Sequence, residues 1–275
     1  MHRRRTALFL MAAALGALGR AEPAAPLHET PGRTVDFSAA VNWDFTRLQK
    51  LDAWQNTALV IRRTLTEWYP PQAHGVALEN SDPQALRTFF TRLTKTAPRE
   101  WSVIYLASHQ SPDGLWQFPH DPPQSWASIL PETPPRREPP RFLVIDACYA
   151  EAADSAVLIQ GTGASGVLYA STRTEAVHEL NFHQRFPIDL TRRYAAEAKW
   201  LREVLGAPWN GRVSFLGFIW LRTFLATGQA PENAAEWNAF FHRCEQLAQA
   251  FRQGRGGDLA TTIHFVSPPA EAPAK

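Results

Sequence analysis

Two apolar runs near the middle of the chain are continuous and do not alternate with polar residues. They read WSVIYLAS at residues 101–108 and RFLVIDA at residues 141–147. Continuous runs of this length are typical of parallel strands that helices cover on both faces. We therefore expect the two runs to form the centre of a sheet. Because nine prolines lie in residues 111–141, that stretch is predicted to be a loop or a series of turns, not a crossover helix.

Apolar residues before the first run recur at intervals of three and four, the spacing of one helix face. They predict a helix over 51–68 that ends at the proline pair 70–71, and a second helix from Pro83 with Ser81 or Asp82 as its N-cap. The other predicted elements are strands at 35–43 and 75–80, a helix at 151–160, a strand at 166–172, helices within 189–205, 215–226 and 231–253, and a strand at 260–266. Such alternation predicts one α/β domain, a three-layer sandwich whose mostly parallel sheet of about six strands is flanked by helices.

The N-terminal residues predict export from the cytoplasm. Residues 1–21 combine three consecutive arginines, an apolar run and a small-x-small site, which is the pattern of a secretory signal peptide. We expect cleavage after Ala21, a linker at 22–33, the domain at 34–267, a disordered tail at 268–275, and a secreted or periplasmic location. An uncleaved N-terminal anchor is the alternative, because the apolar run is only moderately short.

Charge and apolar length exclude two classes of protein. Loss of the signal peptide removes four arginines and no acids, so the formal charge changes from +2 to −2. A near-neutral chain lacks the basic surface that nucleic acid requires. The apolar stretch at 213–228 is short and has Arg222 in its middle, which indicates a buried helix and not a membrane span. We therefore expect no nucleic-acid partner and no stable membrane span in the mature chain.

Two reactive side chains follow the two central strands. His109 follows the first apolar run and Cys148 follows the second, and the carboxyl ends of neighbouring parallel strands are where sites form. A helix predicted to start directly after Cys148 would favour its thiolate, which is the nucleophilic form. A nearby imidazole can protonate a leaving group and activate water. The pair therefore predicts a hydrolase with a Cys/His dyad.

The same residues resemble the caspase-like cysteine peptidases, a family that includes metacaspases, bacterial caspase-like proteins and the legumain group. In that family one strand ends in Ser-(Gly-)His-Gly and a later strand ends in Asp-x-Cys or Gln-Ala-Cys. The matching stretches here are YLASHQ at 105–110 and VIDACYA at 144–150, in the family's order. Weaker matches are NW at 42–43, QN at 55–56, GLWQFPHD at 114–121 and VLYASTRTEAVHE at 167–179. The resemblance extends over most of residues 35–267 and implies a caspase-like fold and a cysteine endopeptidase that acts on protein or peptide substrates.

The resemblance also implies a role for each site residue. Asp146 matches the position that lines the primary specificity pocket in metacaspases, with Asn42 also lining that pocket. A carboxylate there favours cleavage after Arg or Lys, with Asn as the second choice, as in the legumain group. The backbone N–H groups of Gln110 and Cys148 are expected to stabilise the oxyanion. The chemistry requires no cofactor and no metal, although calcium activates some relatives and calcium activation stays open here.

Two departures from the family pattern keep a second hypothesis open. Gln110 replaces the glycine that usually follows the histidine, and a positive φ there would be strained by a side chain. Ala150 and Glu151 stand where Ser-Gly is common. The alternative function is therefore a catalytically inactive caspase-like protein that binds peptides in the same cleft.

The two cysteines also allow other chemistry. A disulfide between Cys148 and Cys244 is the minor hypothesis, because Cys244 falls on an apolar helical stripe and is more simply explained as a buried residue. No zinc site is expected from His109, His120 and Cys148, since the chain has no paired ligand spacing.

Two further patterns have separate interpretations. The Gly-x-Gly-x-x-Gly pattern at 161–166 follows a predicted helix and precedes a predicted strand, so it indicates a turn and not a dinucleotide site. An enzyme that cuts after basic residues could also process itself in the proline-rich loop, at Arg136, Arg137 or Arg141.

Overall fold

The computed structural model describes residues 35–48, 50–69, 76–95, 101–131, 140–150, 152–171, 179–183, 189–206, 209–254 and 261–268. The predicted signal peptide and linker lie outside these residues, as do Arg136, Arg137 and nearly all of the predicted tail.

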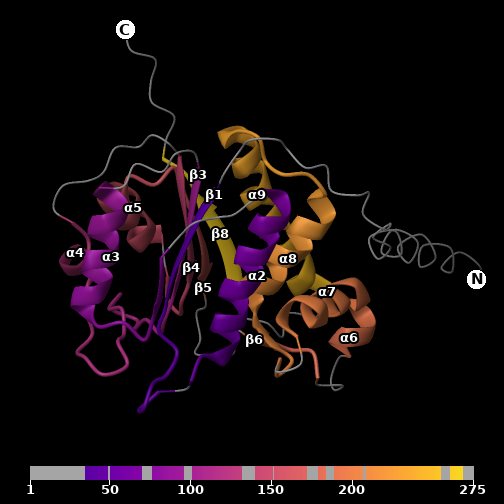
Figure 1. Ribbon diagram of the computed structural model, residues 1–275, viewed down its shortest axis with the longest axis horizontal. Coiled ribbons are helices and arrows are strands. Elements are labelled where there is room, and N and C mark those ends of the chain that lie inside the picture. The colour runs from indigo at the N-terminus through magenta and orange to yellow at the C-terminus, as the bar shows by residue number, and fades with distance from the viewer. Residues whose placement is uncertain are drawn as a thin grey trace, which may run out of the picture.

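A six-stranded sheet in the order β2-β1-β3-β4-β5-β8 forms the middle of the molecule (Figure 1). Its strands are β1 (Val35–Val41), β2 (Ala77–Glu79), β3 (Trp101–Ala107), β4 (Arg141–Asp146), β5 (Gly166–Ser171) and β8 (Thr262–Val266). Every neighbouring pair is parallel except β5 and β8. The two continuous apolar runs form the central strands β3 and β4, as predicted, because both of their faces are buried.

Helices cover both faces of the sheet (Figure 1). On one face lie α3 (Pro83–Lys95), α4 (Trp126–Ile129) and α5 (Ala152–Thr162). On the other lie α2 (Asp52–Trp68), α8 (Phe215–Thr227) and α9 (Ala234–Gly254), with α6 (Leu190–Arg193) and α7 (Ala195–Leu205) beside them. Alternate strand residues enter the two cores: Phe142 and Val144 face α9 and α8, whereas Leu143 and Ile145 face the other layer. The predicted three-layer α/β sandwich is confirmed.

Most predicted element boundaries agree with the structure to within a few residues. Asp82 accepts a hydrogen bond from the Ala85 N–H at 2.6 Å, so it is the N-cap of α3. The glycine pattern at 161–166 is a turn, as predicted: α5 ends at Thr162, Gly163 has φ +64°, and β5 begins at Gly166.

Three features differ from the sequence-based expectation. The single helix expected over 189–205 is broken at Tyr194, whose ring packs against Phe218 and Phe251 with centroids 5.1 and 5.7 Å away. The proline-rich loop contains the short helix α4. A two-stranded sheet of β6 (Glu179–Asn181) and β7 (Arg212–Ser214) was not predicted, because three-residue strands are too short to show a period.

The apolar stretch around Arg222 forms the buried helix α8, where Arg222 pairs with Glu197 at 3.1 Å. Within the described ranges, no helix has both the length and the apolar character that a bilayer span requires.

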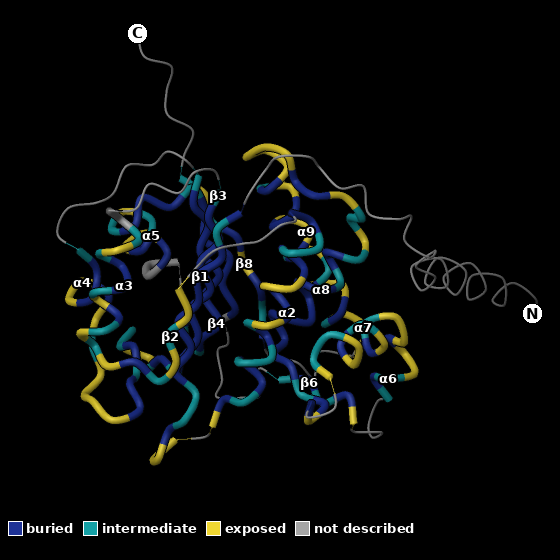
Figure 2. The backbone as a smooth tube through the Cα atoms, in the orientation of Figure 1, coloured by how far each residue is buried: buried dark blue, intermediate teal, exposed yellow. Residues whose placement is uncertain are grey.

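The carboxyl ends of the parallel strands all point to the lower end of the molecule in Figure 1. The loops that follow β1 and β3 lie at this end. Figure 2 shows that this end carries exposed loop tips, whereas the strands above it are buried. Because sites in open α/β sheets form beyond the carboxyl ends of the strands, the predicted site residues are expected at this end.

Candidate active site

The strand register brings the two predicted catalytic residues to equivalent positions. β3 and β4 pair in parallel with Ala107 opposite Asp146. His109 lies two residues beyond Ala107, and Cys148 lies two residues beyond Asp146. Because neighbouring strands lie about 4.8 Å apart, this register puts the imidazole and the thiol at the ends of adjacent strands. Both residues are half-buried, as groups that react with a substrate should be.

His109 is held in place by the hairpin that follows it and by the ring of Phe45. The His109 carbonyl accepts the Gln117 N–H at 2.9 Å, and the Ser108 hydroxyl donates to the Gln117 carbonyl at 2.7 Å. The Phe45 ring meets the His109 ring edge to face with centroids 4.8 Å apart. Since Phe45 is itself buried, it restricts the imidazole to a small range of orientations.

Gln110 adopts a backbone conformation that its side chain tolerates. It forms an antiparallel bridge with Trp116 in the hairpin. In the described part of the chain, the non-glycine residues with positive φ are Asn80 and Tyr149, and Gln110 is not among them. The strain that a side chain would cause in the left-handed region therefore does not arise at Gln110.

Cys148 sits in a turn, and the helix that follows starts later than expected. Cys148 and Tyr149 form the turn, with Tyr149 at φ +56°, and α5 begins only at Ala152. The expectation that a helix starts directly after the cysteine was therefore wrong. Tyr149 lies in the left-handed region, and three residues of the sequence separate Cys148 from the first residue of α5.

The second cysteine lies elsewhere, and neither cysteine forms a disulfide. Cys244 is completely buried on α9, and burial raises the pKa of its thiol to about 12. The disulfide hypothesis is wrong for this structure, and the interpretation of Cys244 as a buried apolar residue is confirmed. In the part of the chain that the structure describes, no group of three His, Cys, Asp or Glu residues is placed to hold a metal ion.

Asp146 is a buried ionisable group near this end of the sheet. Its side chain is completely buried. Burial raises the pKa of the carboxyl to about 6, although hydrogen bonds from Ser214, Tyr105 and Trp54 favour the charged form. Trp54 also donates from its ring N–H to the main-chain oxygen of Asp146 at 3.1 Å. Strongly perturbed carboxylates of this kind occur preferentially at functional sites.

Ser214 links the carboxylate to two helices. Its hydroxyl donates to Asp146 Oδ2 at 2.5 Å and accepts the Gly217 N–H at 3.0 Å as the N-cap of α8. Its own N–H donates to Thr57 Oγ1 on α2 at 3.1 Å. A Cβ on Gly217 would lie 2.5 Å from the Thr57 side chain, so the close crossing of α2 and α8 depends on glycine. Sequence analysis missed Ser214, although a serine directly before an apolar helix is an N-cap signal.

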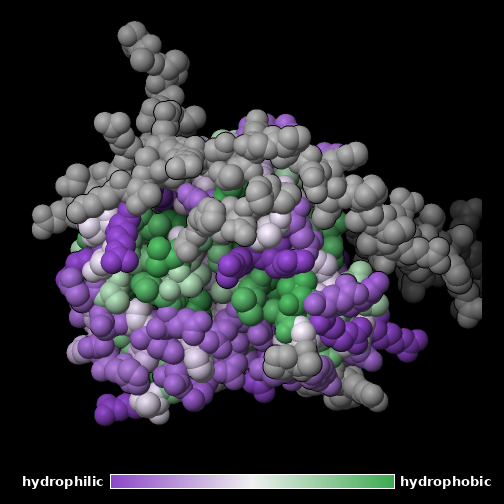
Figure 3. Space-filling view, in the orientation of Figure 1, coloured by the Kyte–Doolittle hydropathy of each residue, from purple (hydrophilic) through white to green (hydrophobic). Residues whose placement is uncertain are grey.

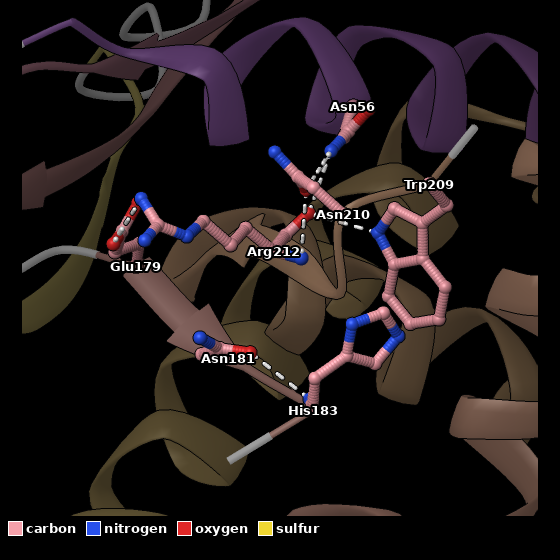
Figure 4. A network of polar contacts seen from close by, with 7 residues as sticks. All are labelled: Asn56, Glu179, Asn181, His183, Trp209, Asn210 and Arg212. Atoms are coloured by element: carbon pink, nitrogen blue, oxygen red, sulfur yellow. Dashed lines mark hydrogen bonds and ion pairs between the residues drawn. The ribbon is translucent and has the colours of Figure 1, made fainter.

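Contacts of Arg212 fix the start of β7 (Figure 4). Arg212 forms an ion pair with Glu179 at 3.4 Å, and its carbonyl accepts hydrogen bonds from Asn56 Nδ2 at 2.7 Å and Trp209 Nε1 at 3.0 Å. Because Arg212 is two residues before Ser214, these contacts fix that end of the strand to α2.

Asn181 shapes the turn after β6, and Gly211 shapes the turn before β7. Asn181 accepts the His183 N–H at 2.9 Å (Figure 4). Gly211 has φ +80°, and a Cβ there would lie 2.5 Å from the His183 ring. Glycine is therefore required at position 211 for conformational and steric reasons.

Asn42 serves mainly to join loops. It is buried, and its Oδ1 accepts the Ser81 N–H at 2.8 Å and the Ser81 hydroxyl at 3.2 Å. Its Nδ2 donates to the Gln117 carbonyl at 3.3 Å. These contacts tie the end of β1 to the hairpin that follows His109, so Asn42 positions the histidine side of the site.

A groove lies beside His109. It encloses about 600 Å³ and is lined by Phe45–Leu48 from the loop after β1 and by Gln117–Pro123 from the loop after β3. Phe45 both lines the groove and contacts the His109 ring. The lower end of the molecule, where these loops lie, is mostly hydrophilic on the face shown in Figure 3, and the lining includes Arg47 and Asp121.

Arg141 does not lie in an accessible loop. It is the first residue of β4, is 4% exposed, and donates from its guanidinium to the carbonyls of Thr162 at 2.6 Å and Leu93 at 2.9 Å. The suggestion of self-cleavage after Arg141 is wrong, because a strand in mid-sheet cannot enter a peptidase site.

Comparisons with known proteins agree with this architecture. No family model matches the chain, and no curated protein matches it. A solved structure of pro-Sf-caspase-1 superposes on it with a TM-score of 0.51 at 9% sequence identity, over 90% of this chain and 97% of that chain. At this identity the likeness establishes the fold alone. The chain has a caspase-like α/β fold, as its sequence motifs predicted.

Proposed function

We propose that the chain is a cysteine endopeptidase in which Cys148 and His109 act as a dyad. The observation that supports this most is the register of β3 and β4, which gives both residues the same position beyond adjacent strand ends. A caspase-like fold supports the same class of enzyme. In an open α/β sheet this edge is where substrates bind.

The proposed reaction is acyl transfer in two steps. The Cys148 thiolate attacks the carbonyl carbon of the scissile bond, and the C–N bond breaks as His109 protonates the leaving amine. His109 then removes a proton from water, which attacks the thioester and releases the carboxylate product and the thiol. The backbone N–H groups of Gln110 and Cys148 stabilise the oxyanion in each step. The ordinary φ of Gln110 removes the backbone strain that favoured an inactive protein.

The substrate is proposed to carry Arg or Lys before the scissile bond, with Asn as the second choice. The family resemblance supports this choice, because Asp146 stands two residues before Cys148, at the position that lines the primary specificity pocket in metacaspases. Asn42 directly follows β1 and is proposed to line the same pocket, where its side chain bonds to Gln117 and Ser81. The groove beside Phe45 provides room for the continuing peptide chain.

Covalent peptide probes test this proposal. Reduced protein is treated with four probes that carry Arg, Lys, Asn or Asp next to the warhead, and the labelled residue is identified by mass spectrometry. We expect Arg and Lys probes to label Cys148, and the His109→Ala variant to lose the labelling. The Cys244→Ala variant is the matched control and should label normally. No labelling by any probe would support the inactive peptide-binding protein.

The location of the protein remains a prediction from residues 1–21. If those residues are a cleaved signal, the intact mass of exported protein corresponds to a chain that begins at Glu22. A mass that includes residues 1–21 would support the uncleaved anchor.

A further inference from the structure

The groove beside His109 has an apolar lining where it is buried. Phe45, Phe118 and Pro119 line it and are buried. Leu48 also lines it, with 46% of its surface exposed to water. The enclosed volume of about 600 Å³ is in the range of ligand pockets, whose walls are mostly apolar. The groove is therefore suited to bind an apolar group that covers Leu48.

The charged residues of the lining do not favour one sign of charge. Arg47 and Asp121 are both exposed and carry opposite charges. Ion pairs at exposed positions contribute little free energy, because water and salt screen them. An acidic or a basic ligand would be attracted by one of these residues and repelled by the other. Apolar contact therefore decides what the groove binds.

The position of the groove assigns it to one part of a peptide substrate. All of the described residues that line it belong to the loops after β1 and β3, at the lower end of the molecule in Figure 1. Phe45 contacts the His109 ring, and the Gln117 N–H donates to the His109 carbonyl. In the proposed reaction Cys148 holds the acyl part of the substrate, and His109 protonates the amine that leaves. The groove therefore lies next to the part of the substrate that follows the scissile bond.

We infer that the groove binds the first residue after the scissile bond and selects a large apolar side chain there. This inference rests on the proposed peptidase function. A leucine side chain in the groove removes its own apolar surface and that of Leu48 from water, whereas glycine has no side chain to bury. The value of kcat/KM should therefore be at least about tenfold higher for a peptide with leucine at this position than for one with glycine.

The reverse of the first chemical step gives a second measure of the same subsite. A free amine bound in the groove attacks the carbonyl carbon of the thioester, and His109 takes the proton from its nitrogen. The C–S bond breaks, Cys148 leaves as the thiolate, and the acyl part is joined to the amine as an amide. Leucinamide should therefore compete with water for the thioester at least about threefold better than glycinamide. Mass spectrometry of the products measures this ratio.

The main test compares two peptides that differ only by Leu or Gly after the scissile bond. Active-enzyme concentrations are set by titrating Cys148 with a covalent probe that carries no residue after its warhead. Leu48→Ser should lower the ratio of kcat/KM for the leucine peptide to that for the glycine peptide by about 3- to 10-fold. The control is Leu59→Ser, because Leu59 is 50% exposed on α2 and is not among the residues that line the groove. It should leave the ratio unchanged.

The outcomes separate this inference from the proposed function. Equal cleavage of the two peptides by the wild-type protein, with equal trapping by the two amides, would overturn the inference while leaving a peptidase. So would a Leu48→Ser variant in which both peptides weaken equally, because that pattern indicates damage to the fold or the dyad and not to a subsite. Absence of Cys148 labelling by every probe would overturn both the inference and the peptidase.

Discussion

The surroundings of the two cysteines show how one fold treats its core and its candidate site differently. Cys244 lies on α9 within an aromatic cluster in which Phe241 packs against Phe142, Trp237 and Phe265 at centroid distances of 4.9 to 5.5 Å. Cys148 is half-buried in a turn that contains a left-handed residue, two residues beyond a buried carboxylate.

The aromatic cluster around Cys244 stabilises the fold, whereas the strand ends near Cys148 contain features that cost stability. The aromatic cluster gains free energy from every ring it buries. At the strand ends, a buried carboxylate with an unsatisfied oxygen and a left-handed tyrosine each cost free energy. Strain and unsatisfied groups of this kind persist where binding or catalysis requires them.

The largest contrast is expected between the two cysteine-to-serine variants. Cys148→Ser should lower the proposed peptidase activity by at least about 10,000-fold with little loss of stability, because the proposed nucleophile is lost from a half-buried turn. Cys244→Ser should keep its activity per folded molecule but lose about 1–3 kcal/mol, because a hydroxyl enters a fully buried site. Peptide hydrolysis and urea unfolding measure the two effects. Equal loss of activity in both variants would contradict the contrast.

The aromatic cluster should be sensitive to truncation. Phe241→Ala is expected to destabilise the protein by about 3–5 kcal/mol, because it removes a completely buried ring that contacts five other rings. Leu59→Ala is the control, since Leu59 is 50% exposed on α2, and should change stability by about 0.5 kcal/mol or less. Urea unfolding at neutral pH measures both. Similar losses in the two variants would show that the cluster does not dominate stability.

Replacement of the buried Asp146 carboxylate by an amide is expected to stabilise the protein at neutral pH, whereas most substitutions in a core destabilise it. The pKa of Asp146 is raised to about 6 in the folded protein, so its contribution to stability is full below about pH 4 and is lost as the pH rises through about 6. The Asp146→Asn variant has no carboxyl group to ionise, so it does not lose this stability as the pH rises. It should be more stable than the wild type above pH 7, by up to about 3 kcal/mol, and similar near pH 4.

Urea unfolding between pH 4 and pH 8 tests this prediction. Asp189→Asn is a matched control, because Asp189 caps α6 at 2.9 Å and asparagine caps a helix equally well. The control should follow the wild-type pH profile. If Asp146→Asn is less stable than the wild type at neutral pH, burial does not penalise the charged carboxylate as described.

The smallest effect is expected at Gln110. Because its φ lies outside the left-handed region, Gln110→Gly should leave activity within about twofold and lower stability by about 1 kcal/mol through added chain entropy. Probe labelling and unfolding measure the two quantities. A gain of activity by a large factor would show that the glutamine side chain obstructs the oxyanion, which would return support to an inactive wild-type protein.

Much of the fold was readable from the sequence because its signals are local. Continuous apolar runs identified β3 and β4, and the three-four spacing identified α2. The break at Tyr194 and the β6–β7 pair were not readable, because they depend on contacts with distant helices and strands. At the site, His109 and Cys148 could be predicted from their places after strands.

The residues that surround Asp146 could not be predicted in the same way. Tyr105 is adjacent to Asp146 only across the β3–β4 register, and Ser214 reaches it from a segment 68 positions away. No periodicity links such positions, since their contact depends on how α2 and α8 cross at Gly217.

The sequence alone therefore determined the α/β class, the two strands at the centre of the sheet and the two candidate catalytic positions, because these follow from the hydrophobic pattern and from the ends of the strands. Only the tertiary structure decided that Gln110 is unstrained and that Arg141 and Asp146 are buried. Backbone angles, burial and hydrogen-bond partners are properties of segments brought together from distant parts of the chain, so they exist only once the layers have packed.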